Sequence, residues 1–549
     1  MRKYIFLLLS LICLLAFVLR FYKVAQDPPA LNWDEVSIGY NAYSILKTGR
    51  DEWGQFLPLH FKSYGEYKLP AQIYASIPAI ALLGLNDFSV RITPVIYGTI
   101  TILLLFFLTR SIFNNQYIAL ISAFLLAISP WHIQLTRASF ESSFSVFWVI
   151  LGIWLLIKGF SKPVWLLVSA IPFAVSVYTY NSARVFTPLF LIAVFLIYYK
   201  SFFINKRFLF LAIILFVFLM LPIVPFVLNG EGSARYKLVS ITDDPGLVLR
   251  VNENRGKSKL IEPLPRLIHN KITYTALAFG QHYLAHFTPD FLFISGAPHK
   301  QHHVQMMGEL YLFQAPFLFF GLYKLFKGKN RFRWLLLSWI LLAFIPVSLT
   351  NDSIPHALRT LIAAPFYQIV TALGIFYFFF NIKRKKIFWQ ISIGFLVITI
   401  LVSIGIYLNN FYNIYPKLYS RDWQYGNKQA VDFIKQNYSS YDMIVFTRYY
   451  GEPHMFTLFY LNYDPGKFQN NPNLVRFETY DWIRVLSFDK FYFPDLGDQG
   501  TKFIDIINKN PDKKILFIGK SNDFPTNVPR LKKITFLNLD PAFDIVEHK

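Results

Sequence analysis

Residues 208–227 read FLFLAIILFVFLMLPIVPFV and contain no charged side chain. As a helix, a run of about 20 apolar residues is long enough to cross the roughly 30 Å hydrocarbon core of a bilayer. The rest of the chain has the same character, because 54% of its 549 residues are hydrophobic, 19% are aromatic and only 16% are charged. This composition excludes an ordinary soluble globular protein and predicts several membrane spans.

Other stretches on both sides of this run are also apolar and long enough to span. They are residues 4–19, 92–109, 117–135, 144–158, 164–179, 186–200, 310–326, 334–350, 361–380 and 387–408. The first of them follows Met1-Arg2-Lys3 and resembles a signal peptide, but no small-x-small cleavage pattern follows it at residues 20–23. We therefore interpret it as an uncleaved span and expect about eleven transmembrane helices.

The charges between these stretches predict the orientation of the chain in the membrane. Lys and Arg total 54 against 32 Asp and Glu, a formal charge of +22, and nearly all of the excess lies before about residue 410. A basic excess placed between apolar runs indicates the membrane as partner and does not indicate nucleic acid. If the short apolar stretch 71–85 lies on the outer surface as an amphipathic helix, the inner connections contain no Asp or Glu. We therefore expect the N-terminus inside and the C-terminus outside.

Three outer segments are too long to be simple connections, namely residues 25–91, 229–309 and 410–549. The sequence thus predicts a transmembrane catalytic domain over 1–409, with the first two segments as its outer loops. It predicts a small extracytoplasmic α/β domain over 410–549, because strand-like patches at 442–446 and 514–519 accompany a helix-like patch at 429–436.

Several kinds of chemistry are disfavoured by the motifs. The chain has no Gly-rich phosphate loop, no GxSxG elbow and no HExxH sequence, so we expect no nucleotide cofactor. Its single cysteine, Cys13, excludes an intramolecular disulfide and a cysteine-ligated zinc site.

The densest polar cluster lies in the first outer segment. It contains Asn32-Trp33-Asp34-Glu35, then Tyr64-Gly65-Glu66-Tyr67-Lys68-Leu69-Pro70, and ends at Arg91-Ile92-Thr93-Pro94. An acidic pair soon after the first span, a basic residue at a turn that opens a surface helix, and this entry to the next span resemble the GT-C glycosyltransferases. Within that superfamily the pattern is similar to the protein O-mannosyltransferase and lipid A aminoarabinose transferase branch, glycosyltransferase family 39-like.

The resemblance implies roles for individual residues. Asp34 matches the acid taken in the family as the base that deprotonates the acceptor, and Glu35 matches its neighbour. Lys68 matches the basic residue that holds the lipid phosphate, although Leu69 stands where the family usually has proline. The segment 129–132, followed by Arg137 and Glu141, is similar to the second outer loop, where the family places an arginine and often a second acid.

The chemistry of such a transfer agrees with these roles. A sugar on a polyprenyl phosphate already has a good leaving group, so the site needs a carboxylate for the acceptor proton and cations for the phosphate. A single displacement would invert the anomeric configuration. We expect Asp34, Glu35 and Glu141 as catalytic residues and Lys68, Arg137, Arg184 and Arg359 as donor-phosphate ligands. The expected cavity residues are Tyr64, Glu66, Tyr178, Tyr180, His132 and His356.

Each assignment has a simpler alternative. The acidic pair could open a surface helix at Val36 through the helix dipole, and Lys68 could only reach towards the membrane interface. Arg137 and Glu141 could be an i,i+4 ion pair, and the segment 178–184 an aromatic belt with an anchoring arginine. His282 with His286, and His299, His302 and His303, have spacings compatible with a divalent metal, but a polar, histidine-rich loop is the simpler interpretation. Metal dependence stays open.

The leading hypothesis is an inverting membrane glycosyltransferase that moves a hexosyl or pentosyl group from a polyprenyl-phosphate donor to a lipid, polysaccharide or protein acceptor on the outer face of the cell membrane. A lipid-linked sugar transporter or flippase is one alternative, disfavoured because the span interiors carry almost no charge. An oligosaccharide ligase that uses a diphosphate carrier and a non-catalytic scaffold are the others.

Overall fold

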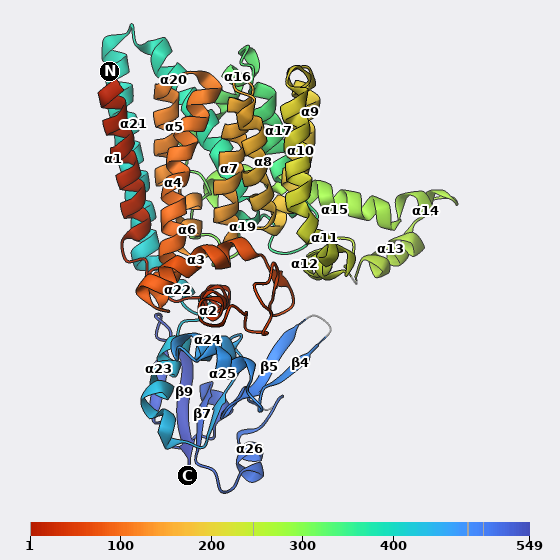
Figure 1. The fold of residues 1–549 in the computed structure, drawn as a ribbon, viewed down its shortest axis with the longest axis vertical. Helices are drawn as coiled ribbons and strands as arrows, with labels where there is room; N and C mark the ends of the chain where they lie inside the picture. Colours follow the sequence, from red (N-terminus) through yellow and green to blue (C-terminus); the bar gives the residue numbers. More distant parts are fainter. Residues whose placement is uncertain (1, 245, 480–481, 498) are drawn as a thin grey trace. The chain divides into compact units, whose positions relative to one another are not determined.

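The computed structural model of the chain describes residues 2–244, 246–479, 482–497 and 499–549. It separates into two compact units, each assembled from distant parts of the sequence (Figure 1). A helical unit comprises the chain up to Arg20 together with Val95–Thr136 and Glu141–Tyr407. An α/β unit comprises Phe21–Pro94, Arg137–Phe140 and Leu408–Lys549. The first outer segment thus folds with the C-terminal residues, whereas the division made from sequence placed it in a membrane domain over 1–409.

Long apolar helices form the helical unit. Some of them are long and apolar enough to cross a membrane. They are Lys3–Phe21, Asp87–Phe113 (α4), Glu141–Gly159 (α7), Asn181–Ile204 (α9), Lys206–Leu228 (α10 with α11), Ala357–Ile382 (α19 with α20) and Lys386–Tyr419 (α21 with α22). Among the described residues these make seven candidate spans, or eight if the bent pair Gln116–Ile128 (α5) and Pro130–Arg137 (α6) is one span. The chain is therefore a multi-pass helical membrane protein.

The expected count of eleven spans is not confirmed. The stretch at 117–135 is broken by a 55° bend before Pro130, a residue that fits the first turn of a new helix. The other three expected spans are α8 (Val164–Val177), α16 (Gln314–Lys327) and α17 with α18 (Arg333–Ser348), all shorter than a full crossing. A proline or a broken turn shortens a helix without changing the apolar composition that the sequence analysis relied on.

Close packing in the helical unit uses glycine. A Cβ added to Gly321 of α16 would overlap the carbonyl of Val370 in α20, and one added to Gly374 would overlap the carbonyl of Phe317. Small residues that let two helix backbones approach are typical of helix contacts in membranes. The segment between α11 and α16 adds the short helices α12 (Ala234–Val239), α13 (Gly246–Lys257), α14 (Leu264–Ile268) and α15 (Lys271–Ala285).

A seven-stranded mixed sheet forms the base of the α/β unit. Its strand order is β4-β5-β6-β3-β7-β9-β8, and β3 pairs in parallel with β6 and β7 while the other pairs are antiparallel. The strands are β3 (Met443–Phe446), β4 (Val475–Glu478), β5 (Ile483–Phe488), β6 (Phe491–Tyr492), β7 (Ile515–Gly519), β8 (Lys532–Thr535) and β9 (Pro541–His548). The strands expected near 442–446 and 514–519 are confirmed, as is the helix expected at 429–436, which is α23 (Asn427–Asn437).

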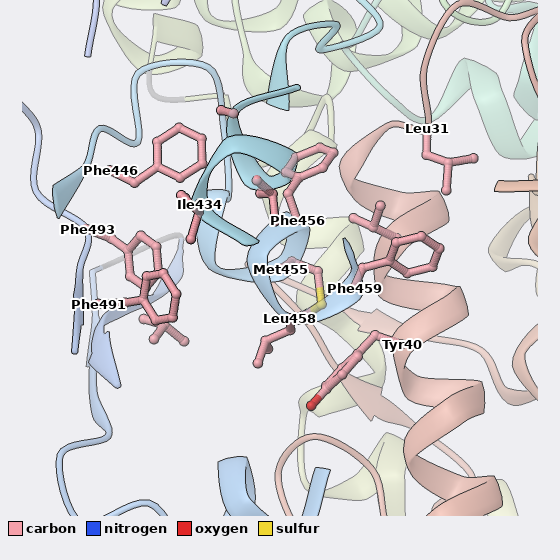
Figure 2. Packing of buried hydrophobic residues seen from close by; sticks show 14 of the residues in the cluster. Leu31, Tyr40, Ile434, Phe446, Met455, Phe456, Leu458, Phe459, Phe491 and Phe493 are labelled. Carbon is pink, nitrogen blue, oxygen red and sulfur yellow. The ribbon is translucent and has the colours of Figure 1, made fainter. Parts of the chain in front are cut away.

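The first outer segment packs on this domain through α2 (Trp33–Thr48) and α24 (Pro453–Tyr460) (Figure 2). Phe456 and Phe459 of α24 are buried in one apolar cluster with Tyr40 of α2 and with Phe446 of the sheet. Gly39 lies so close to α24 that a Cβ there would be 2.6 Å from the Phe459 ring. Burial of this apolar surface is what holds residues 21–94 to the C-terminal domain.

The remaining elements of the first outer segment are short. A two-stranded ribbon, β1 (Phe61–Lys62) with β2 (Tyr67–Lys68), leads into α3 (Pro70–Leu83), which packs on α2. The helix expected at 71–85 is therefore present, and it is part of the α/β unit. Two further helices complete that unit, α25 (Pro465–Gln469) and α26 (Phe503–Lys509).

Candidate functional site

A capping box starts α2 and places the two acids. The side-chain oxygen of Asn32 accepts a hydrogen bond from the Glu35 amide at 3.0 Å, and the Glu35 carboxylate accepts one from the Asn32 amide at 3.2 Å. The helix begins at Trp33, three residues before the start considered from sequence. Asp34 and Glu35 therefore lie in its first turn, where the helix dipole favours negative charge.

Asp34 forms an ion pair with Lys68, at the end of β2. The Lys68 side chain is 3% exposed and the Asp34 side chain 30% exposed. The cation is thus buried behind a carboxylate that solvent reaches. Such an arrangement orients the carboxylate and leaves it accessible to a substrate hydroxyl.

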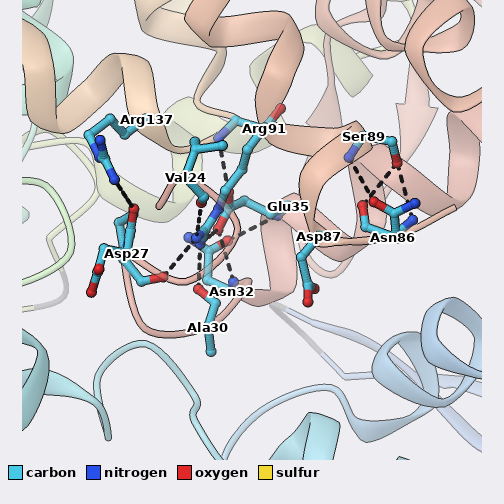
Figure 3. Close-up of polar contacts among 12 residues, drawn as sticks. Val24, Asp27, Ala30, Asn32, Glu35, Asn86, Asp87, Ser89, Arg91 and Arg137 are labelled. Atoms are coloured by element: carbon cyan, nitrogen blue, oxygen red, sulfur yellow. Dashed lines mark hydrogen bonds and ion pairs between the residues drawn. The ribbon is translucent and has the colours of Figure 1, made fainter. Parts of the chain in front are cut away.

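Glu35 has the opposite environment (Figure 3). Its oxygens accept hydrogen bonds from Arg91 Nε at 2.8 Å, from Arg91 Nη2 at 2.9 Å and from the Ser139 amide at 3.0 Å, and both partners of the ion pair are fully buried. Arg91 also donates to the carbonyls of Val24, Pro28 and Ala30. Glu35 therefore fixes the chain around α2, and its side chain is not exposed to solvent.

Three aromatic side chains lie beside Asp34. The ring of Tyr64 is 6.0 Å from that of Trp33 and stacks on Trp482 at 5.9 Å. The Tyr64 hydroxyl donates to the Trp33 carbonyl at 2.8 Å. Burial raises the pKa of Tyr64 well above its usual value, as does the nearby charge of Asp34, so the phenol stays protonated and keeps this bond. We call Trp33, Tyr64 and Trp482 the aromatic wall.

The C-terminal residues hold this wall in place. The Trp33 amide donates to Gln424 Oε1 at 2.7 Å, and Trp482 Nε1 donates to Glu452 at 2.5 Å. Gly451, at a φ of +124°, packs against the Trp33 ring, where a Cβ would be 2.6 Å from it. No local pattern predicts these contacts, because Trp33 and Gln424 are 391 residues apart.

Arg137 is also more enclosed than the sequence suggested. It is fully buried and donates to the carbonyls of Tyr22 at 2.7 Å and Asp27 at 2.8 Å, with its guanidinium 4.8 Å from the Phe411 ring centroid. These contacts join the start of the first outer segment to the residues that follow α21. Arg137 ends α6 whereas Glu141 starts α7 and is partly exposed, so the two do not share a helix as an i,i+4 pair would.

In the helical unit, Arg184 is a candidate phosphate ligand whose side chain has hydrogen-bond donors without a partner among the described residues. It lies in the first turn of α9, with its guanidinium 5.4 Å from the Phe226 ring centroid. Its buried Nε and Nη2 atoms have no hydrogen-bond partner within the described part of the chain. Of the two tyrosines expected near it, Tyr180 is the N-cap of α9, and Tyr178 donates through its hydroxyl to the Leu219 carbonyl at 2.7 Å.

The other expected residues of the helical unit are engaged in structural contacts. His132 is buried and accepts from Arg20 at 2.7 Å. His356 caps α19, and its amide donates to His286 at 3.0 Å. Arg359 pairs with Asp352 at 2.6 Å and is nearly buried. These contacts do not favour a direct role for His132, His356 or Arg359 in binding substrate.

No set of three or more His, Cys, Asp or Glu side chains in the described ranges is arranged to hold a metal ion. His303 pairs with Glu309 at 3.1 Å, and the rings of His299 and His302 stack with centroids 3.7 Å apart. Glu66, in the turn between β1 and β2, is partly exposed, and its carbonyl accepts from the Ser63 amide.

The chain matches a family model described as dolichyl-phosphate-mannose-protein mannosyltransferase over residues 73–226. No curated protein matches it in sequence. Among solved structures it is similar to ArnT from Cupriavidus metallidurans, in the apo state at 11% identity and a TM-score of 0.52, covering 100% of this chain and 98% of that one. The undecaprenyl-phosphate-bound ArnT gives 12% identity, a TM-score of 0.52 and coverage of 99% and 98%.

An oligosaccharyltransferase from Archaeoglobus fulgidus, tethered with an acceptor peptide, is similar at 15% identity and a TM-score of 0.51. The match covers 83% of this chain and 63% of that one, so the chain spans less than two thirds of the oligosaccharyltransferase. Together with the family match, these folds confirm the resemblance to GT-C glycosyltransferases that the loop motifs indicated.

Proposed function

We propose that the protein is an inverting glycosyltransferase that moves one sugar from a polyprenyl-phosphate donor to a hydroxyl acceptor at a cell membrane. The observation that carries the proposal is the ion pair of Asp34 with the buried Lys68, on the first turn of α2. The family model and the similarity to ArnT, solved with undecaprenyl phosphate, support the donor class.

Asp34 acts as the general base. As the acceptor oxygen attacks the anomeric carbon, its proton passes to the Asp34 carboxylate, and the bond from that carbon to the phosphate oxygen breaks. Polyprenyl phosphate leaves as an anion and needs no proton from the protein. Because the displacement occurs once, the anomeric configuration inverts, and Glu35 is not required as a nucleophile.

Lys68 has a different role from the phosphate ligand expected from the family. Buried beside Asp34, it holds the carboxylate in one orientation through the ion pair, which is what a positioned base needs. Within the helical unit, taken by itself, Arg184 is the candidate ligand for a lipid phosphate. Its unpartnered Nε and Nη2 donors offer the bidentate geometry that suits a phosphate oxygen pair.

The aromatic wall provides the sugar-binding surface. Trp33 and Trp482 are both partly exposed, and an indole face presents the apolar surface on which the C–H face of a pyranose packs. The wall stands next to the carboxylate on α2, so a sugar lying on it would have a hydroxyl near Asp34. We place the active site on the extracytoplasmic side, in agreement with the acidic outer segments.

The decisive experiment uses the full-length protein in liposomes with a panel of polyprenyl-phosphate sugars. Release of free polyprenyl phosphate is followed for the wild type, Asp34→Asn and the control Asp432→Asn, which removes an exposed carboxylate from α23. We expect release from one donor, a loss of about 10²-fold or more in Asp34→Asn, and no change in the control.

Equal release by Asp34→Asn and wild type would reject Asp34 as the base. Release only from a diphosphate-linked oligosaccharide would replace the proposal by an oligosaccharide ligase. Movement of an intact lipid-linked sugar across the membrane, without cleavage, would identify a flippase.

A further inference from the structure

The α/β unit contains an open groove of about 770 Å³ that the proposed chemistry at Asp34 does not use. It lies between the end of α23, the segment that joins α24 to α25, and the turn from β5 to β6. Side chains that line it include Lys435, Tyr438, Tyr463, Lys467, Asn470 and Asp489. We call it the distal groove.

The charges of the distal groove cancel. Two lysines, Lys435 and Lys467, face two aspartates, Asp464 and Asp489. A site for a lipid phosphate or a nucleotide would need an excess of basic side chains, because phosphates are held by charge-assisted hydrogen bonds. The balance therefore favours a neutral ligand.

The other polar groups of the lining suit sugar hydroxyls. Three asparagine amides, Asn462, Asn470 and Asn471, each offer a donor and an acceptor. Tyrosine adds a hydroxyl and an apolar ring face in one side chain. Neighbouring hydroxyls of a sugar also donate and accept side by side, and the C–H face of the ring packs on an aromatic surface. Amides, carboxylates and tyrosines in one groove thus match a neutral saccharide.

Asp489, an exposed residue, links several polar groups of the distal groove. Its carboxylate accepts hydrogen bonds from the hydroxyls of Tyr438 at 2.5 Å and Tyr463 at 3.3 Å, and its amide donates to Asn471 at 3.2 Å. Burial and then the charge of Asp489 raise the pKa of Tyr463 to about 12, so its phenol remains a donor at neutral pH. The polar groups are fixed before any ligand arrives, which lowers the entropy cost of binding.

The distal groove rests on the helix that carries Asp34. The Tyr40 hydroxyl of α2 donates to the Tyr463 carbonyl at 3.1 Å, and Gln469 of α25 donates to Ser44 of α2 at 3.1 Å. Asp34 and Tyr40 are six residues apart, or about 9 Å along the helix axis at about 1.5 Å per residue. The distal groove and the first turn of α2 are therefore supported by the same helix.

We infer that the distal groove binds a neutral oligosaccharide, namely the part of a glycan acceptor that lies beyond the reacting hydroxyl. The biological role rests on the proposed transferase function, whereas the binding itself is independent of it. The acceptor class is thereby a glycan, free or attached to a carrier, and not a protein hydroxyl.

Binding is measured on the full-length protein in nanodiscs by saturation-transfer NMR and calorimetry, with four probes: maltotetraose, cellotetraose, mannotetraose and chitotetraose. The variants are Asp489→Asn, which keeps the shape of the side chain, and Asn470→Ala, which removes one of the amides. The matched control is Asp512→Asn, an exposed loop residue of the same unit outside the distal groove. We expect one or more probes to bind, with Kd raised about tenfold by Asp489→Asn and less by Asn470→Ala, and unchanged in the control.

Failure to bind any of the four probes would overturn the inference, and so would binding that both groove variants leave intact. Binding of a serine- and threonine-rich peptide that competes at Asp489, without saccharide binding, would overturn it in favour of a protein acceptor. Asp34→Asn separates the two proposals, because it should bind the probes as wild type does. If Asp34→Asn loses transfer and the wild type binds no saccharide, only the inference on the distal groove is rejected. If the wild type binds saccharide and Asp34→Asn transfers normally, only the assignment of Asp34 as the base is rejected.

Discussion

Asp34 and Glu35 are neighbours in sequence with opposite surroundings. A helix turns by about 100° per residue, so consecutive side chains point to different sides. One carboxylate is partly exposed beside Lys68, while the other is fully buried against Arg91. The acidic pair therefore combines a carboxylate that solvent reaches, our candidate base, with one that positions the helix.

The buried ion pair of Glu35 with Arg91 leads to a prediction on the stability of the folded protein. Both Glu35 oxygens accept from Arg91, so Glu35→Gln would set an amide donor against a guanidinium donor and leave Arg91 without a counter-charge. We expect a loss of about 3–5 kcal/mol in the free energy of unfolding, measured by thermal or denaturant unfolding in detergent. Asp34→Asn should cost less than half as much, because the Asn oxygen still accepts from Lys68 and the site is partly exposed.

Equal losses in Glu35→Gln and Asp34→Asn would contradict this division of roles. Glu35→Gln protein that remains folded should still turn over, at a rate reduced through misplacement of α2 and not through loss of a base. Its pH–rate profile should therefore keep the shape of the wild-type profile.

The surroundings of Glu52 predict how the stability of the protein depends on pH. It is nearly buried, and its carboxylate accepts from Asn41 at 3.0 Å. Burial raises the pKa of Glu52, so the folded state favours the protonated form and the ionised form lowers stability at neutral pH. Glu52→Gln, which can still accept from Asn41, should raise Tm at pH 7. The gain should shrink as the pH falls and vanish below about pH 4, where Glu is protonated in the unfolded chain as well.

The measurement compares Tm for the variant and wild type from pH 7 to pH 4. Asp432→Asn serves again as the exposed control and should show no pH-dependent gain. A lower Tm for Glu52→Gln at neutral pH, or a gain that does not change with pH, would refute the explanation by burial.

At the scale of elements, the first turn of α2 is held by loops of the C-terminal domain. Gly451 has a φ of +124°, a region that favours glycine, and its Cα faces the Trp33 ring. Gly451→Ala should strain the backbone by about 1–3 kcal/mol and displace Trp33, lowering the rate of transfer about tenfold or more. The matched control is Gly54→Ala, which has a φ of +83° but no atom within 4 Å of the added Cβ.

Transfer rates and Tm of both glycine variants give the test. The control should lose stability through backbone strain alone and keep its rate per folded molecule. If Gly451→Ala keeps that rate as well, contact with Trp33 does not position the base.

The elements also show what the sequence could predict. Apolar length and period are local properties, so long helices such as α4 and α9 and the strands β3 and β7 could be located. The break before Pro130 and the 14-residue α8 depend on how helices end and pack, which apolar composition does not encode. The proximity of Asp34 and Lys68 could be predicted, because both residues belong to the same segment, residues 25–91. Trp482 could not, because its contact with Tyr64 depends on long-range packing.

At the scale of the whole molecule, the α/β unit is built from segments that are far apart in the sequence, residues 21–94, 137–140 and 408–549. Val36 and Tyr40 of α2 are buried in the same apolar cluster as Phe456 and Phe459 of α24. No residue close to α2 in the sequence indicates that α2 packs against α24. The C-terminal domain is consequently part of the support of the candidate base, in addition to any role in binding the acceptor.

This organisation predicts the outcome of removing residues 410–549. If the C-terminal domain only selected the acceptor, a chain ending at 409 would still release polyprenyl phosphate from its donor. We expect instead that release is lost together with transfer, because truncation exposes the apolar face of α2 and frees Trp33 from Gln424. Limited proteolysis should cut residues 25–91 in the truncated protein and spare them in the full chain, and adding back 410–549 as a separate chain should restore protection in part. A truncated protein with normal donor cleavage and a protected first segment would show that α2 folds and works without its C-terminal partner.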